Sequence, residues 1–189
     1  MFDDSAPISL YAMRVRLIPG VIFAIVLIVP VLVRPGFAQR VVMKNGATLR
    51  MSGGAVWDLN DSKMDFGDVG STARLEEHSG GRVTGGRLTA SRSMNNPSSS
   101  DAAGLGAEIS APVDLGAVTV TRGHTSHSLP GNGSSIKRFY DISSSKSHPH
   151  LGATLTFHYA DGELEAVSES TLELFKSDDG GSTWKPKGA

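Results

Sequence analysis

The chain has 189 residues, with 18 basic and 19 acidic side chains, six histidines and no cysteine. A near-neutral balance of this kind provides no basic face for nucleic acid, and the lack of cysteine excludes a disulfide framework. Aromatic residues make up 6% of the chain and glycine accounts for 22 residues, a composition that favours short strands and tight turns over a helical bundle.

The N-terminal stretch has the pattern of a secretory signal peptide. Arg14 and Arg16 form a positive region before an apolar run over 21–33. Gly36 and Ala38 then provide the small −3 and −1 positions of a cleavage site. We therefore interpret 1–38 as a signal peptide, so that contact with a membrane is confined to export.

Two features of the N-terminal stretch bear on the signal-peptide interpretation. A transmembrane anchor is the rival interpretation, but Pro19 and Pro30 interrupt the run, which is shorter than the roughly 20 residues that a spanning helix needs. Asp3 and Asp4 are acidic where the leader should be basic, and a start at Met13 gives a better positive region.

Residues 39–92 alternate short β-prone pieces with glycine turns. Asn45-Gly46 is the strongest turn signal, because both residues tolerate positive φ. Strands this short need neighbours, supplied either by stacked rungs of a β-solenoid or by a plain antiparallel sheet, and the recurrences GATL, GGAV, GGRV and GGRL favour rungs. We expect Trp57 to be a packing residue, with carbohydrate stacking as the alternative. The predicted strands are Arg40–Met43, Ala47–Met51, Ala55–Leu59, Ala73–Glu76 and Arg87–Ala90.

The region 93–104 lacks periodicity and predicts a linker. Residues 105–189 then predict an antiparallel β-sandwich-like region, whose 136–184 stretch we interpret as a β-meander. Its strands are expected at Ala117–Thr121, Ile136–Ile142, Ala153–Tyr159 and Thr171–Phe175. Because the chain ends soon after Trp184, this sandwich could be incomplete. The predicted fold class is therefore all-β.

The sequence SDDGGSTW at 177–184 matches the Asp-box pattern S-x-D-x-G-x-T-W. Such a motif forms a self-contained hairpin tip, in which the aspartate accepts backbone N–H bonds and the tryptophan packs under the loop. We expect it to be structural rather than catalytic. Its residues are Ser177, Asp179, Gly181, Thr183 and Trp184.

Two other residue sets contain groups of the kinds found in metal sites and in glycosidases. His124 with His127, and His148 with His150, have spacings that zinc sites use, but their flanking residues are those of polar loops, and we expect no metal or cofactor. A glycosidase needs two carboxylates across a groove, which the sequence cannot place. We expect a solvated surface role for the scattered acids Glu76, Glu77, Asp161, Glu163, Glu165 and Asp178.

Ordered sequence blocks run along the mature chain. They are NGATL (45–49), GGRVTGGRLTA (80–90), NNPSS (95–99), GLGAEI (104–109), LGAVTVTRGH (115–124), IKRFYDI (136–142), LGATLTFHYADGEL (151–164) and STLELFKSDDGGSTW (170–184). These blocks resemble secreted surface proteins of the Bacteroidetes and Chlorobi lineages, which often end in a type IX secretion sorting domain. The resemblance implies extracellular β-modules without assigned catalysis, and it makes this chain similar to a C-terminally truncated member.

The sequence thus predicts a secreted or cell-surface, non-catalytic structural or interaction module. Its partners would be cell-surface components or glycans. The alternative is a carbohydrate-binding or carbohydrate-active domain, suggested by the Asp box and the aromatic residues.

Overall fold

The computed structural model describes residues 39–147 and 151–187, so the predicted signal peptide lies outside the described residues. The described chain is all-β, as predicted, and its helical elements are 3-10 turns of three residues each. The strands are β1 (Arg40–Val42), β2 (Thr48–Met51), β3 (Val56–Asp58), β4 (Lys63–Asp65), β5 (Arg74–Glu77), β6 (Arg82–Thr84), β7 (Arg87–Asn95), β8 (Ser100–Asp101), β9 (Ala107–Ser110), β10 (Asp114–Gly123), β11 (Ser128–Leu129), β12 (Gly133–Ser134), β13 (Phe139–Ser144), β14 (Thr154–Phe157), β15 (Phe175–Lys176) and β16 (Lys185–Pro186). The turns are η1 (Pro130–Asn132), η2 (Asp161–Glu163) and η3 (Glu169–Thr171).

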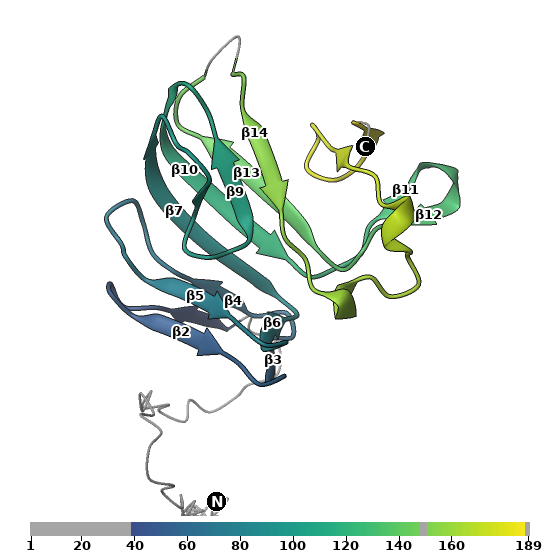
Figure 1. Cartoon of the computed structure of the whole chain (residues 1–189), viewed down its shortest axis with the longest axis horizontal. Helices are drawn as coiled ribbons and strands as arrows, with labels where there is room; N and C mark the ends of the chain where they lie inside the picture. The colour runs from purple at the N-terminus through teal and green to yellow at the C-terminus, as the bar shows by residue number, and fades with distance from the viewer. Residues whose placement is uncertain (1–38, 148–150, 188–189) are drawn as a thin grey trace, which may run out of the picture. The chain divides into compact units, whose positions relative to one another are not determined.

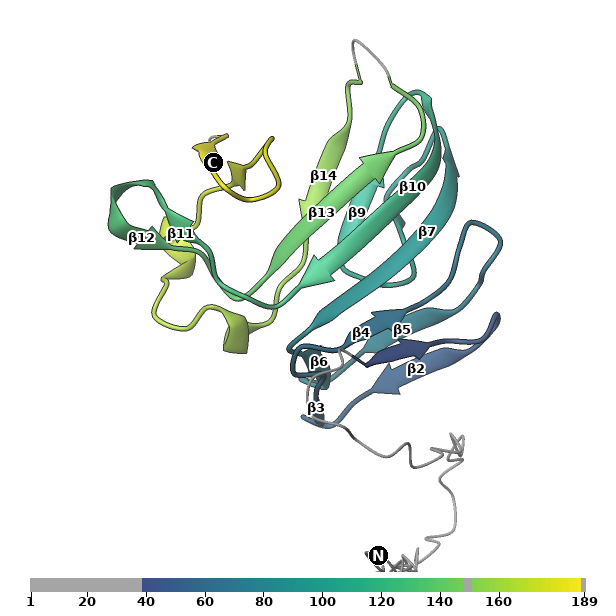
Figure 2. The ribbon, with the colours of Figure 1, turned by 180° about the vertical axis from the view of Figure 1, so that it is seen from behind.

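The short strands of the glycine-rich part, β1 to β6, pair in parallel, and we call them the coils. Strands β1, β4 and β7 form one parallel ladder, β2 pairs with β5, and β3 pairs with β6. Of the two arrangements left open by the sequence, the pairing is thus the parallel one rather than a plain antiparallel sheet. Figures 1 and 2 show these short strands at one end of the longer strands β7, β10 and β13.

Sequence alternation explains which side chains of the coils are buried. Met64 of β4 lies in register with Leu88 of β7, and both are wholly buried, while Lys63 is exposed. Trp57 of β3 lies opposite buried Val83 but keeps 37% of its surface exposed. Trp57 thus lies at the surface and outside the buried core cluster.

Strand β7 belongs to both parts of the chain. It continues the parallel ladder on one side and pairs antiparallel with β10 on the other, and β10 in turn pairs with β13. A second sheet, in the order β14-β9-β8, contributes Ala107 and Ile109 to the same buried cluster as Leu88 and Val120. The coils and the antiparallel strands thus share a five-stranded sheet and a core.

Three local predictions were wrong. The 136–184 stretch is no meander, because β13 pairs with β10 whereas β14 pairs with β9 of the other sheet. The expected linker 93–104 holds the end of β7 and all of β8. Of the predicted strand Thr171–Phe175 only Phe175 is in a strand, β15: Thr171 ends η3, and the Leu172 N–H bonds locally to the Glu169 carbonyl.

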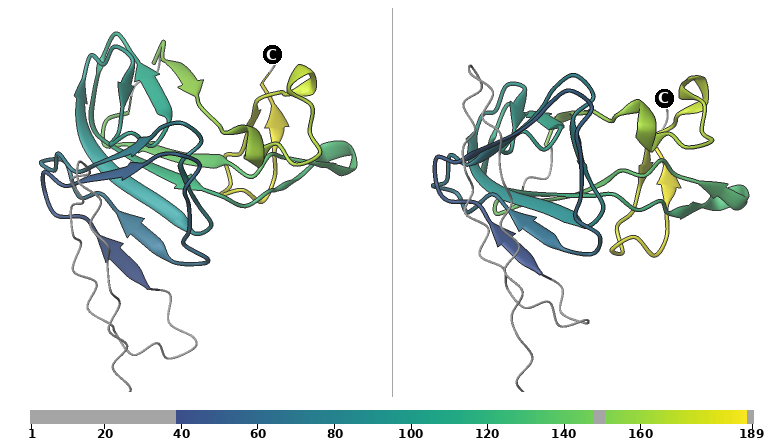
Figure 3. Two further views of the ribbon diagram at one scale, coloured as in Figure 1. Left: turned by 60° about the horizontal axis from the view of Figure 1, so that its bottom comes forward. Right: turned by 90° about the horizontal axis from the view of Figure 1, so that it is seen from below.

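The C-terminal segment from Ala160 onwards is held differently from the sheets. Its strands β15 and β16 pair only with one another, and none of its described residues after Glu163 is buried. Figure 3 shows the last part of this segment, after η3, on the side of β11 and β12, whereas Gly162 of η2 lies beside Arg82 of β6. The segment encloses space rather than filling it, which creates the candidate site.

Candidate functional site

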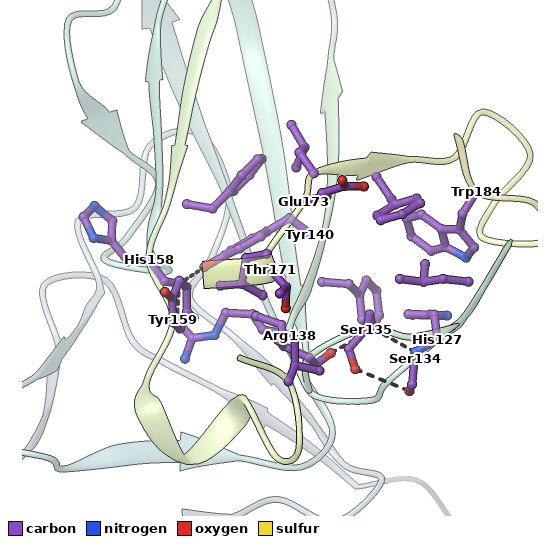
Figure 4. A pocket seen from close by; sticks show the side chains of 18 residues that line it. His127, Ser134, Ser135, Arg138, Tyr140, His158, Tyr159, Thr171, Glu173 and Trp184 are labelled. Atoms are coloured by element: carbon purple, nitrogen blue, oxygen red, sulfur yellow. Dashed lines mark hydrogen bonds between the residues drawn. The ribbon is translucent and has the colours of Figure 1, made fainter. Parts of the chain in front are cut away.

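A cavity of about 360 Å³ lies between the start of β13, the end of β14 and the C-terminal segment (Figure 4). Its walls are mainly aromatic and aliphatic. The described residues that line it are His127, Leu129, Ser134, Ser135, Ile136, Arg138, Phe139, Tyr140, Phe157, His158, Tyr159, Val167, Thr171, Leu172, Glu173, Leu174, Phe175 and Trp184.

Three rings form one end of this cavity. His127 packs edge-on against Phe139, with ring centroids 4.7 Å apart. Its ring is tilted against that of Trp184, with centroids 5.0 Å apart. The Arg87 guanidinium lies 5.6 Å from the Phe139 ring, within the range of a cation–π contact. The His127 Nε2 is buried and forms no hydrogen bond with any described residue. This end therefore offers apolar surface with one unused polar atom.

Tyr140 and Phe157 form the floor between the two sheets. Their rings stack with centroids 4.9 Å apart and an interplanar angle of 21°. The Tyr140 hydroxyl lies 2.8 Å from the Gly106 carbonyl oxygen and 3.0 Å from that of His158, so it donates to backbone acceptors. Burial raises the pKa of this hydroxyl above its ordinary value. Tyr140 is thus a packing residue and a poor proton donor to a ligand.

An ion pair closes the other end. The Arg138 Nε donates to Glu163 Oε1 at 3.0 Å and lies 2.8 Å from Oε2 in the ion pair, and Glu163 is only 3% exposed. Arg138 Nη1 also donates to the His158 carbonyl at 2.6 Å, and the Ala160 N–H donates to Glu163 at 2.8 Å. The pair fastens the segment after β14 to β13, and the charge of Arg138 is already compensated.

A second cavity, also of about 360 Å³, shares Arg138, His158 and Tyr159 with the first. Its other lining residues are polar or small. They are Glu77, Gly80, Gly81, Arg82, Gly106, Arg122, Ala160, Asp161 and Gly162.

A buried charge network forms the wall of this second cavity. Arg122 has no exposed surface, and its Nη1 and Nη2 each donate to Glu77 at 2.8 Å. Burial by itself would raise the pKa of Glu77, but the hydrogen bonds and charge of Arg122 hold it below its ordinary value. The Arg122 Nε donates to His124 Nε2, so His124 must be neutral and its Nδ1–H donates to the Gly85 carbonyl. Burial, with Arg122 nearby, lowers the pKa of His124 to about 4.

The Asp box forms a hairpin tip between β15 and β16. The Asp179 carboxylate accepts from the N–H groups of Ser182 and Thr183, at 3.0 and 2.9 Å, and from the Thr183 hydroxyl at 2.6 Å. The Ser177 hydroxyl accepts from the Gly181 N–H at 2.8 Å, and Gly181 adopts φ of +90°. These bonds hold the pKa of Asp179 well below its usual range.

Comparison of the chain with protein-family models, with curated proteins and with solved structures gives no match. The function of the chain is therefore inferred from the geometry of its cavities. In the part of the chain that the structure describes, no helix is long and apolar enough to cross a membrane. The same residues contain no group of three or more His, Asp or Glu side chains that could hold a metal ion.

The structure separates the histidines that the sequence suggested as ligands. His124 is bonded to Arg122 and Gly85, whereas His127 lies in the aromatic cluster with Trp184. His148 and His150 lie outside the described residues.

The expected solvated role of the acids was wrong for two of them. Glu77 and Glu163 are held by Arg122 and Arg138, because each guanidinium is buried and requires a counter-charge. The sequence reasoning missed these arginines and also Arg82. Alternation in β10 could have indicated a buried Arg122, since it continues the inward positions of Val118 and Val120, whereas Arg138 precedes β13 and has no such signal.

Proposed function

We propose that this chain is a secreted or cell-surface, non-catalytic interaction module that binds its ligand in the cavity beneath the C-terminal segment. One observation carries the proposal: the cavity offers aromatic and aliphatic surface, while the buried cation in its wall, Arg138, is already paired with Glu163. Ligand sites are commonly concave and mainly apolar with few polar groups. The leader-like pattern at 14–38 and the resemblance to exported β-modules support placement outside the cell.

The carboxylates argue for binding rather than hydrolysis. Glu173 is the one carboxylate among the described residues that line the first cavity. In the second cavity Glu77 is engaged by both Nη atoms of Arg122, which leaves Asp161. A glycosidase requires two free carboxylates across the substrate. Neither cavity provides such a pair among its described walls.

A carbohydrate ligand is the second candidate within this proposal. The rings of Phe139, Tyr159 and Trp184 line the first cavity, and aromatic faces with a few polar groups suit the mixed surface of a sugar. Under this alternative the chain is a carbohydrate-binding domain.

The proposal is tested with purified protein on a panel of oligosaccharides and of extracted cell-surface components. Binding is followed by calorimetry, and turnover by chromatography of the recovered panel. We expect binding that is lost in Trp184→Ala and unaffected in Trp57→Ala, since Trp57 lies on β3 and outside the cavity. Release of shortened products would overturn the non-catalytic assignment. Failure to bind any member of the panel would overturn the binding function.

A further inference from the structure

One arginine of the second cavity has no side-chain partner among the described residues. Three arginines line it, and two of them, Arg122 and Arg138, donate to Glu77 and Glu163. Arg82 of β6 is half-buried, yet its guanidinium forms neither a hydrogen bond nor an ion pair with the residues that the structure describes. A partly desolvated guanidinium with five unused donors favours a bound anion, above all a carboxylate that can accept two parallel bonds.

The surroundings of Arg82 leave room for such a group. Gly162, in η2, packs beside the guanidinium, and a methyl group added there would lie 3.1 Å from Arg82 Nη2. The absence of a side chain at this position therefore leaves the guanidinium accessible from the cavity. Gly80 and Gly81 line the same space, so much of its wall is backbone.

An aromatic ring lies next to this space. Tyr159 lines both cavities, and its hydroxyl donates to the Glu169 carboxylate at 2.9 Å, which fixes the ring. Figure 4 shows Tyr159 beside His158 and near Arg138, at the end of the first cavity opposite Trp184. A ring and a guanidinium on adjoining walls match a ligand that has both an apolar face and a carboxylate.

We propose that the two cavities together bind an acidic oligosaccharide, with a hexuronate carboxylate on Arg82 and the sugar face against Tyr159. This inference rests on the proposed binding function and names its ligand class. The other arginines of the site stay with their internal partners, so Arg82 alone distinguishes an acidic sugar from a neutral one.

The negative charge of Asp161 should affect binding of an acidic sugar in the opposite direction to the positive charge of Arg82. This exposed carboxylate lines the same cavity, and no ion pair joins it to Arg82. Because like charges repel, it opposes an anionic ligand. Removal of the Asp161 charge is therefore expected to strengthen binding, whereas removal of the Arg82 charge weakens it.

The test is calorimetric titration of the protein with trigalacturonate and with a hyaluronan tetrasaccharide, with methyl-esterified trigalacturonate as the neutral match. We expect at least one of the two acids to bind about tenfold or more tightly than the ester, as one charge-assisted bidentate contact provides. Arg82→Gln should abolish this preference. Asp161→Asn should increase acid affinity about two- to fivefold, and added salt should reduce it.

Two further variants separate ligand contact from folding. Arg50→Gln removes the same charge from an exposed surface pair with Glu76 and should leave binding unchanged. Gly162→Ala places a methyl group against a movable guanidinium end and should weaken acid binding with little change in melting temperature.

Equal binding of acid and ester, or an Arg82→Gln variant that binds the acid as the parent does, would overturn the inference and leave the proposed function intact. Binding of neither acid would also overturn it, and the panel with Trp184→Ala would then decide the function separately.

Discussion

Arg122 of β10 and Glu77 of β5 form a bidentate ion pair whose guanidinium has no exposed surface. The pair joins the parallel coils to the antiparallel strands, because β5 belongs to the former and β10 to the latter. It also holds the Val83 N–H, which donates to Glu77 at 2.7 Å. The interaction thus lies where the two parts of the fold meet.

Glu77→Gln should destabilise the protein by about 3–5 kcal/mol, because it leaves the buried Arg122 charge without compensation. Urea denaturation followed by fluorescence measures the change. The control is Glu76→Gln, whose exposed pairs with Arg50 and Arg74 should lead to a much smaller loss. Equal effects at 76 and 77 would contradict the assigned role of the buried pair.

Stability should fall as the pH drops from about 6.5 to about 4. The pKa of His124 is lowered to about 4 in the fold but returns to its ordinary value on unfolding, so in this window the unfolded state binds the extra proton. Below this window Glu77 adds to the loss, because its pKa is lowered in the folded state and its stabilisation disappears on protonation. Melting temperatures measured across the range should show the slope.

The fall in melting temperature between about pH 6.5 and about pH 4 should be much smaller in His124→Gln. Glutamine keeps a side-chain acceptor for the Arg122 Nε–H but cannot take up a proton. His158→Gln is the matched control, since His158 is exposed and its ion pair with Glu108 lies at the surface. An unchanged pH profile in the 124 variant would show that other groups cause the acid sensitivity.

Asp179→Ala should loosen the Asp-box tip without unfolding the sheets. The carboxylate holds the amides of Ser182 and Thr183, whereas β15 and β16 pair with no other strand. Hydrogen exchange should therefore accelerate at these two amides, while the melting temperature changes little. Asp178→Ala is the adjacent control, because Asp178 pairs only with the exposed Lys176. Faster exchange throughout the sheets would contradict a self-contained hairpin.

Leu88→Ala should cost about 2–5 kcal/mol and lower a single unfolding transition as a whole. Leu88 is wholly buried, in register with Met64 of the coils and with Arg122 of β10. Calorimetry with spectroscopic probes measures whether the transitions coincide. Ser93→Ala, at an exposed position of the same strand, should have little effect. Two separate transitions in the parent protein would show that the shared core does not couple the parts.

The all-β class and most strand positions could be predicted because they depend on local properties. Alternation places Leu75 and Val118 inward, and Asn45-Gly46 turns the chain whatever surrounds it. The Asp box is equally local, since Asp179 bonds to residues within four positions of itself. Strand partners are not local, which is why the predicted meander failed: nothing near β13 and β14 in sequence encodes that they pair with β10 and β9.

The candidate site could not be predicted for the same reason. Arg82 lies far in sequence from Tyr159 and Gly162, and none of the three belongs to a motif. By itself the sequence determined what short-range patterns decide, namely strands, turns and the Asp-box tip. Only the tertiary structure decided which acids are buried beside arginines and which arginine of the second cavity has no side-chain partner among the described residues, because desolvation and ion pairing depend on distances between strands that the chain brings together only on folding.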